Sequence, residues 1–304
     1  MHMEYSFPRY LLSKQSVDDR ALNPRVYAAL HSSLPYQSPL RITEVGAGIG
    51  TMFTRLIHWG LLDKADYTVV DETPENIHYA REWLPRQARE AGFEVEESGN
   101  SLRLYDASRD IRVHLLASDV FEFAQTQAPR AHLLIANAFL DLLPLPESLT
   151  SLFSLVEPKG LAWLTINFDG VTIFEPQIDP ALDAQIENLY HRSMDERLTG
   201  GQSSGDSRTG RHLFAYLRQP GLGAEIIEAG SSDWVVYPHQ GHYPADEAYF
   251  LHFILYFFER TLSGNPDLDP ARFADWLAAR RAQIEKGELI YIAHQMDFLV
   301  RVHG

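Results

Sequence analysis

Between residues 41 and about 168, short apolar runs alternate with stretches whose apolar positions recur at a helical period. The apolar runs, rich in Val, Ile, Leu and aromatic residues, predict strands at 41–48, 67–71, 111–119, 131–139 and 161–168. The stretches between them predict helices at 51–60, 73–92, 120–127 and 146–158. Strands that are apolar on both faces and separated by helices predict a parallel sheet that is covered on both sides.

The residues at the ends of these segments predict several local starts and turns. Asn23-Pro24 and Thr73-Pro74 each combine an N-cap residue with a first-turn proline. Ser16 with Asp19 three residues later resembles a capping box, so two short helices are expected before the first strand. Gly99-Asn100, between FEVEES and SLRLYD, predicts a hairpin that decorates the surface.

The part of the chain after residue 170 predicts more helices and a closing strand. Helices are expected at 177–200, 211–221, 246–262 and 270–286, strands at 224–238 and 290–302, and a mobile Gly/Ser-rich loop at 199–210. The expected organisation is a single compact domain. It consists of an N-terminal helical cap (1–40), a ligand-binding core (41–170), a helical lid or insertion (171–222) and a C-terminal part that completes the sheet and adds two helices (223–304).

A glycine-rich turn, Gly46-Ala-Gly-Ile-Gly50, joins the first expected strand to its helix. Glycines let the backbone approach a ligand closely, and the helix N-terminus adds free N–H groups and a partial positive charge. A P-loop is excluded because no Lys-Ser/Thr pair follows the turn. The dinucleotide fingerprint Gly-x-Gly-x-x-Gly requires glycine at position 51, where this chain has threonine, so an NAD(P) site is disfavoured.

Acidic and amide side chains follow the next expected strands. Asp71 ends the second strand, where a carboxylate can accept both hydroxyls of a ribose. Asp119 follows the third strand and Asn137 ends the fourth. Because the carboxyl ends of parallel strands share one edge of the sheet, these residues are expected to line one ligand site.

The segment Glu44-Val-Gly-Ala-Gly-Ile-Gly50 resembles the first motif of class I S-adenosylmethionine-dependent methyltransferases, and the resemblance continues through residues 41–168. It implies a Rossmann-like, doubly wound α/β sheet of seven strands, the last antiparallel, with an N-terminal helical cap and helical insertions. It also implies that the glycine turn lies against the methionine part of the cofactor, that Glu44 helps to position it, and that Asp119 accepts from the adenine amino group. The expected cofactor-binding residues are Lys14, Glu44, Gly46, Ala47, Gly48, Gly50, Asp71, Glu72, Ser118, Asp119, Val120, Asn137 and Ala138.

Lys14 and Arg20, in the N-terminal cap, could pair with the carboxylate of the cofactor, although Arg20 could equally bridge to Asp18 or Asp19 on the surface. Tyr5, Phe7 and Tyr10 could cover the cofactor, and core packing explains them as well. Phe121 is expected beside the adenine ring with Val120, and Phe139 beside the methyl-transfer centre with Asn137 and Ala138.

Composition narrows the class of acceptor. The net charge of the 304 residues is -15, which disfavours nucleic acids and anionic membranes. The absence of cysteine excludes disulfides, zinc–thiolate sites and thiol nucleophiles. No signal-peptide pattern is visible, and the longest apolar stretch (248–258) is about half of a membrane span, so a cytoplasmic protein is expected. That stretch is expected to be core or a homodimer face.

Candidates for acceptor chemistry lie outside the cofactor motifs. Asn137-Ala-Phe-Leu-Asp141 lacks the Asn/Asp-Pro-Pro-aromatic signature associated with amino-group methylation of nucleobases or glutamine amides, which favours a small-molecule acceptor methylated on O, N or C. Arg208 and Arg211 could bind an acceptor carboxylate or phosphate, or be solvated loop charges. His239 and His242 could supply a base or metal ligand, although a surface loop is favoured, and no metal is expected. The catalytic candidates are Asp141, His191, Arg208 and His242.

The resemblance thus predicts methyl transfer from S-adenosylmethionine to a small molecule by direct displacement, with S-adenosylhomocysteine as product. Two alternatives stay open. One is a protein of the same fold that binds the cofactor without transferring a methyl group. The other, disfavoured by Thr51 and Asp119, is an NAD(P)-dependent oxidoreductase.

Overall fold

The computed structural model describes residues 5–35, 39–126, 129–199 and 201–303; residues 1–4 and 36–38 of the expected cap, Gln127 of the expected helix 120–127, and Gly200 of the expected loop lie outside this range. The helices are α1 (Phe7–Ala21), α2 (Pro24–Ser33), α3 (Thr51–His58), α4 (Pro74–Glu90), α5 (Val120–Ala124), the 3₁₀ helix η1 (Leu140–Leu142), α6 (Glu147–Ser154), α7 (Pro180–Asp195), α8 (Thr209–Tyr216), α9 (Glu247–Leu262) and α10 (Pro270–Glu285). The strands are β1 (Leu40–Val45), β2 (Lys64–Asp71), β3 (Glu94–Ser98), β4 (Ser101–Tyr105), β5 (Asp110–Ala117), β6 (Ala131–Asn137), β7 (Val156–Glu175), β8 (Leu198–Thr199), β9 (Gln202–Ser203), β10 (Ala224–Ser231), β11 (Trp234–Val236) and β12 (Ile290–Val302).

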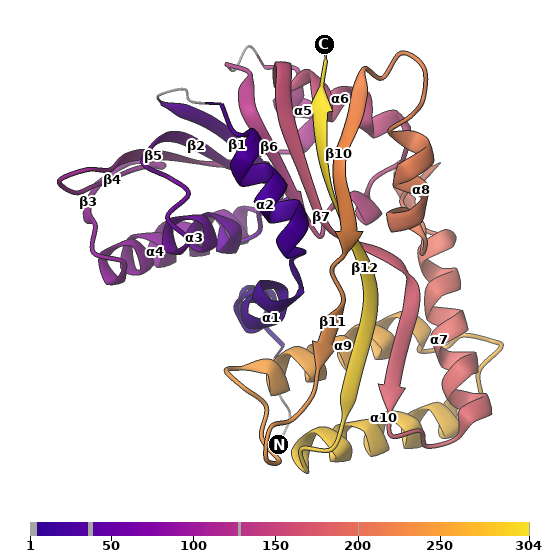
Figure 1. Cartoon of the computed structure of the whole chain (residues 1–304). Coiled ribbons are helices and arrows are strands. Elements are labelled where there is room, and N and C mark those ends of the chain that lie inside the picture. The colour runs from indigo at the N-terminus through magenta and orange to yellow at the C-terminus, as the bar shows by residue number, and fades with distance from the viewer. Residues whose placement is uncertain (1–4, 36–38, 127–128, 200, 304) are drawn as a thin grey trace.

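One ten-stranded sheet organises the molecule, with the strand order β10-β12-β7-β6-β1-β2-β5-β4-β3 and β11 paired to β12 (Figure 1). Strands β5, β2, β1, β6 and β7 are parallel, and β12 runs antiparallel between β7 and β10. This confirms the predicted doubly wound α/β sheet with an antiparallel last strand. The sheet has ten strands and not the predicted seven, because the hairpin β3–β4 and the short strand β11 extend it. The central strands β1 and β6 are almost entirely buried because helices cover both faces, which explains their continuous apolar runs.

The two faces of the sheet are covered by different helices. Buried side chains of α2, α3 and α4 pack with Ile42, Leu133 and Trp163 on one face. Side chains of α5, α6 and α8 pack with Val45 and Leu134 on the other face. Because helices cover both faces of the sheet, a ligand is expected at the carboxyl ends of β1, β2, β5 and β6, as in other open α/β sheets.

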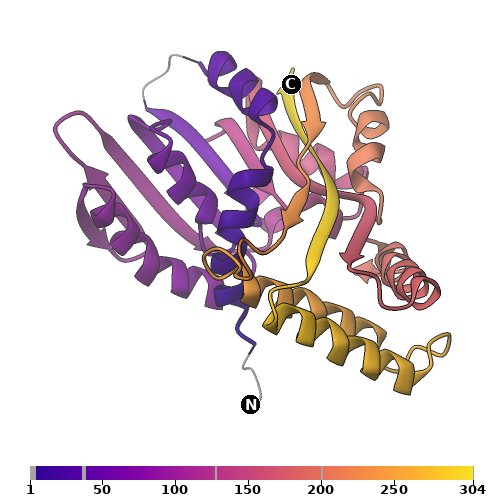
Figure 2. The same cartoon turned by 60° about the horizontal axis from the view of Figure 1, so that its bottom comes forward.

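Strands β7 and β12 continue beyond the parallel core as a long antiparallel ribbon, on which α7, α9 and α10 pack (Figure 2). The ring of Phe174 on β7 lies 5.3 Å from that of Phe258 on α9 and 5.4 Å from that of Trp276 on α10. Most side chains of α9 are buried, so its apolar stretch belongs to the core.

Several local predictions are confirmed and others are wrong. Asn23 caps α2 by accepting from the backbone N–H groups of Arg25 and Val26. Thr73 occupies the N-cap position of α4, but its side chain makes no capping hydrogen bond. The predicted hairpin turns between β3 and β4, but it extends the sheet beside β5 instead of only decorating the surface. The predicted capping box at Ser16 is wrong, because α1 continues unbroken through it and its hydroxyl donates to Glu247.

Candidate cofactor site at the carboxyl ends of the strands

The glycine turn between β1 and α3 requires glycine at each of its three positions. Gly46, Gly48 and Gly50 have φ values of 60°, 57° and 81°, a left-handed backbone that side chains disfavour. A Cβ on Gly46 would lie 2.2 Å from the Phe139 ring, and one on Gly48 would lie 2.8 Å from Leu11 of α1. The turn is therefore shaped for close approach of neighbouring atoms.

Asp71 is buried at the end of β2 and braces this turn. One of its oxygens accepts from the backbone N–H of Gly48 at 2.7 Å, and the other accepts from Thr73 N–H at 3.0 Å and Asn76 Nδ2 at 2.9 Å. A carboxylate has about four lone-pair sites, so a bonded Asp71 can still accept from a ligand. Glu72, the next residue, is exposed.

The other strand-end residues lie on neighbouring strands, because β6, β1, β2 and β5 are adjacent in the sheet. Asp119 is the N-cap of α5, and its Oδ1 accepts from the N–H groups of Phe121 and Glu122. Asn137 ends β6, and its Oδ1 accepts from Thr165 Oγ1 at 2.8 Å. Ala138, with a φ of 52°, has the strained left-handed backbone often found at functional sites.

Other predicted cofactor residues also lie at the carboxyl ends of these strands, in the turns and helix starts that follow them. Ala47 donates its N–H to Val70 O, Gly50 is the N-cap of α3, Ser118 donates its hydroxyl to Asp119 O, and Val120 is buried at the start of α5.

The carboxyl group of Glu44 is buried and accepts a 2.7 Å hydrogen bond from the Tyr67 hydroxyl. Burial raises the pKa of Glu44 to about 7, against the opposing effects of this bond and of Arg55. Glu44 thus bonds within the protein.

Helix α1 is connected to this edge through the buried carboxylate of Asp18, which also forms an ion pair within the helix. Lys14 Nζ lies 2.5 Å from Asp18 Oδ2, and the other Asp18 oxygen accepts from Trp234 Nε1 at 2.9 Å. Asn137 Nδ2 lies 3.5 Å from the same carboxylate. The expectation that Asp18 is a surface residue is wrong, since it is 1% exposed. Lys14, expected to pair with a cofactor carboxylate, is paired with Asp18.

Other predicted basic and histidine residues are engaged elsewhere. Arg20 bridges to Glu247 of α9, not to Asp18 or Asp19, and Arg211 bonds Asp169 of β7. His191 Nε2 lies 3.0 Å from Thr172 Oγ1, and burial lowers the pKa of His191. Arg208 occupies the N-cap of α8. His242 is exposed in a loop, with its backbone paired to that of His239. Within the described ranges, no group of three or more His, Asp or Glu residues is arranged to hold a metal ion.

Asp141, the remaining catalytic candidate, lies in η1 directly after the end of β6. Its Oδ1 is buried and has no hydrogen-bond partner among the described residues. Burial raises the pKa of the Asp141 carboxyl group, while the nearby Arg197 and Lys14 lower it.

Sequence reasoning missed Leu11, Trp234 and Arg197, because no motif marks them and the fold brings them to this edge from distant segments.

The glycine turn and the acids are of the kind that a sulfonium nucleoside needs, because carboxylates suit its cationic parts and glycines permit close backbone contact. The cradle above Gly46 and Gly48 is filled by the side chains of Phe139 and Leu11. The chemistry of the turn, Asp71 and Asp119 fits the cofactor, while Phe139 and Leu11 occupy the space above the turn in this structure.

The strand order, the strand directions and the N-terminal helices together define a class I methyltransferase-like fold. None of the helices in the described part of the chain is long and apolar enough to cross a membrane.

Comparison with known proteins gives matches among solved structures alone: no family model and no curated protein matches the sequence. A S-adenosylmethionine-dependent methyltransferase from Thiobacillus denitrificans, solved with S-adenosyl-L-homocysteine, is 14% identical and has a TM-score of 0.47 over 99% of this chain and 100% of its own. A second, from Geobacter sulfurreducens and also solved with S-adenosyl-L-homocysteine, is 15% identical, with a TM-score of 0.44 over 98% of this chain and 100% of its own. At such identities the similarity concerns the fold.

Proposed function

We propose that this protein is an S-adenosylmethionine-dependent methyltransferase acting on a small molecule. The observation that carries the proposal is the glycine turn of β1 together with Asp71, Asp119 and Asn137 on the ends of adjacent strands. An NAD(P) enzyme is less well supported, because Thr51 replaces the third glycine of the dinucleotide fingerprint.

Each of these residues has a distinct role in the proposal. Asp71 accepts the ribose hydroxyls while continuing to hold the Gly48 N–H. The second oxygen of Asp119 accepts from the adenine amino group, because Oδ1 caps α5. Leu11 and Phe139 move from above the glycines and lie against the bound nucleoside. The Asp18 carboxylate, through its contacts with Trp234 and Asn137, keeps α1 over the site.

The cofactor supplies a methyl group already activated on a sulfonium. What remains for the protein is alignment and the exclusion of water, which can account for much of the barrier in a displacement reaction. Helix α1 provides this cover, since its Leu11 side chain contacts the turn and its Asp18 contacts the end of β6. No metal has a role in the proposal.

Calorimetry with S-adenosylhomocysteine tests the cofactor assignment. We expect wild-type binding and a loss of at least tenfold in affinity for Asp71→Asn, because a charge-assisted hydrogen bond contributes about 1.5–3 kcal/mol. Asp63→Ala is the matched control, since Asp63 is an exposed acid just before β2, at the opposite end of that strand. Absence of wild-type binding, or equal affinities for Asp71→Asn and wild type, would refute the assignment.

Methyl transfer is tested separately, with a labelled methyl donor and a panel of metabolites. Incorporation of label into any small molecule supports the enzyme. Tight cofactor binding without transfer to any member of the panel would instead support a binding protein of the same fold.

A further inference from the structure

Two buried tyrosines and one half-buried tyrosine, from three separate elements, lie near the candidate cofactor site. Tyr10 comes from α1, Tyr190 from α7 and Tyr291 from β12. We call these three residues the tyrosine layer. None of the hydrogen bonds among the described residues involves their hydroxyl groups, so these groups are free to bond a ligand or water.

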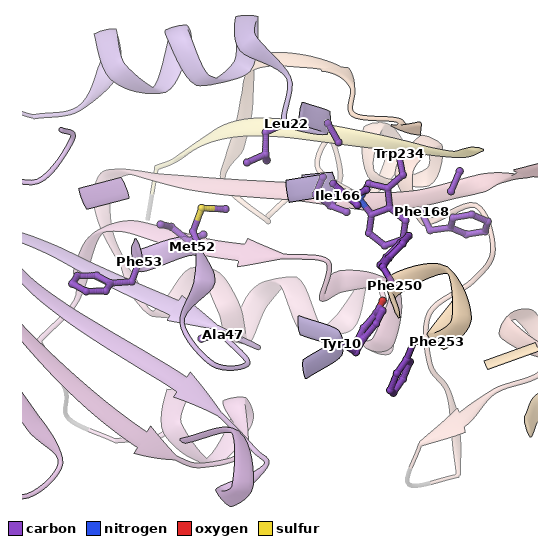
Figure 3. Packing of buried hydrophobic residues seen from close by; sticks show 14 of the residues in the cluster. Tyr10, Leu22, Ala47, Met52, Phe53, Ile166, Phe168, Trp234, Phe250 and Phe253 are labelled. Carbon is purple, nitrogen blue, oxygen red and sulfur yellow. The ribbon is translucent and has the colours of Figure 1, made fainter. Parts of the chain in front are cut away.

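A continuous set of aromatic contacts holds the tyrosine layer together. The Phe250 ring lies 5.9 Å from that of Tyr10 and 6.2 Å from that of Tyr291, and the Tyr190 ring stacks on Phe258 at 3.9 Å. Figure 3 shows Tyr10 together with Phe250, Phe253 and Trp234. The rings of the tyrosine layer therefore lie in an aromatic environment, which suits contact with another flat ring.

The environment keeps these hydroxyl groups protonated. Burial raises the pKa of Tyr190 to about 12 and the pKa values of Tyr10 and Tyr291 well above their ordinary range. The nearby Asp141 carboxyl group raises the pKa of Tyr10 and Tyr190 further. Neutral phenols can each donate a hydrogen bond to a ligand and accept one from it.

Asp141 adds an unpaired acceptor beside this layer. Its Oδ1 is buried without a partner in the described ranges, and Arg197 donates to its backbone carbonyl at 3.2 Å, not to its carboxylate. It lies four residues after Asn137, at the strand end where the methyl group is expected. The buried Oδ1 of Asp141, unpaired among the described residues, with the tyrosine hydroxyl groups close enough to interact electrostatically with it or with one another, marks a place where a ligand could bond.

We propose that the tyrosine layer and Asp141 form the acceptor site and that its substrate is a small aromatic ring carrying a hydroxyl group. This inference rests on the proposed methyl-transfer function. A hydroxyl group is favoured over an amine because a weakly acidic O–H needs a base, whereas a neutral amine attacks with its own lone pair.

The proposed step balances as follows. The acceptor oxygen forms a bond to the methyl carbon, and the carbon–sulfur bond breaks with its electron pair remaining on sulfur. The hydroxyl proton passes to the Asp141 carboxylate and from there to solvent. Burial raises the pKa of the Asp141 carboxyl group above its ordinary value, so this carboxylate is a stronger base than an exposed one. Tyr190 donates to the ring substituents and orients the acceptor.

The test uses phenol, catechol and aniline as acceptors, with labelled methyl donor. We expect label in phenol or catechol and none in aniline. Asp141→Asn should lower kcat about 10²–10⁴-fold and remove the acidic limb of the pH–rate profile. S-adenosylhomocysteine binding should remain unchanged. Glu147→Gln, an exposed acid at the start of α6, is the matched control and should retain wild-type kcat.

A binding measurement does not depend on turnover. Calorimetric titration of phenol into the protein saturated with S-adenosylhomocysteine should show binding that Tyr190→Phe weakens about fivefold, because one neutral hydrogen bond is lost. Labelling of aniline alone, labelling of none of the three rings, or unchanged kcat in Asp141→Asn would overturn the acceptor assignment. Failure of S-adenosylhomocysteine to bind the wild type would instead overturn the proposed function.

Discussion

The first two glycines of the turn after β1 are constrained by both backbone conformation and space. Gly46 combines a φ of 60° with a Phe139 ring 2.2 Å from the position of its missing Cβ. For Gly46→Ala we expect a loss of about 1–2 kcal/mol from the left-handed backbone and about 1–3 kcal/mol more from displacing the ring. Urea denaturation measures the total.

Gly60 provides the control for this substitution. Its φ of 68° is also left-handed, but nothing lies within 4 Å of the position of its Cβ. Gly60→Ala should therefore lose only the backbone contribution, about 1–2 kcal/mol. Equal losses in the two variants would contradict close packing of Phe139 on the turn.

The buried carboxyl group of Glu44 predicts a pH dependence of stability. Its folded-state pKa of about 7 lies above the ordinary value of 4.5, so between these values the folded protein holds a proton that the unfolded chain has released. The free energy of unfolding should therefore fall as pH rises from 4.5 to 7, at a rate of up to about 1.4 kcal/mol per pH unit from this group.

Glu44→Gln isolates this contribution, because Glu187 and Asp297 also have raised pKa values and titrate in the same range. Urea denaturation at several pH values should show a shallower decline for the variant than for the wild type. Parallel curves would mean that Glu44 does not hold a proton in the folded protein.

At the scale of elements, α1 shows why its partners escaped sequence analysis. Lys14 and Asp18 are four residues apart and face one another on a continuous helix. The predicted capping box placed a helix start at Ser16 between them, which hid the pairing. Trp234 reaches Asp18 from β11, more than 200 positions away in the chain, and no local pattern can encode such a contact.

The Lys14–Asp18 pair should couple strongly in a double-mutant cycle. Asp18→Ala leaves Lys14 buried without its partner, so we expect a loss of about 3–5 kcal/mol in unfolding free energy. Lys14→Met combined with Asp18→Ala should be less destabilising than the sum of the two single changes. The exposed pair Arg89–Glu97 is the control, with an expected coupling of about 0–1 kcal/mol. Additive effects at Lys14 and Asp18 would contradict the buried pair.

At the scale of the whole molecule, the sheet was predictable and its extension was not. The apolar runs that became β1, β6 and the first part of β7 encode burial on both faces, and those of β2 and β5 encode burial on at least one face, which is a local property of the sequence. The continuation of β7 to Glu175 depends on its pairing with β12, so it is decided by residues more than 100 positions away. The position of Asp71, Asp119 and Asn137 at the ends of adjacent strands was predictable for the same reason as the sheet. The tyrosine layer, built from α1, α7 and β12, was not.

The net charge of -15 makes a prediction about the whole chain. Like charges repel more strongly in the compact state, so added salt should stabilise the protein by screening this repulsion. At pH 8, Tm should rise between 10 and about 200 mM NaCl, as measured by calorimetry. Near the sequence pI of about 5.3 the net charge vanishes, and the same addition of salt should leave Tm unchanged or lower it by weakening surface ion pairs. A fall in Tm with salt at pH 8 would mean that local pairs such as Arg103–Asp110 outweigh the long-range repulsion.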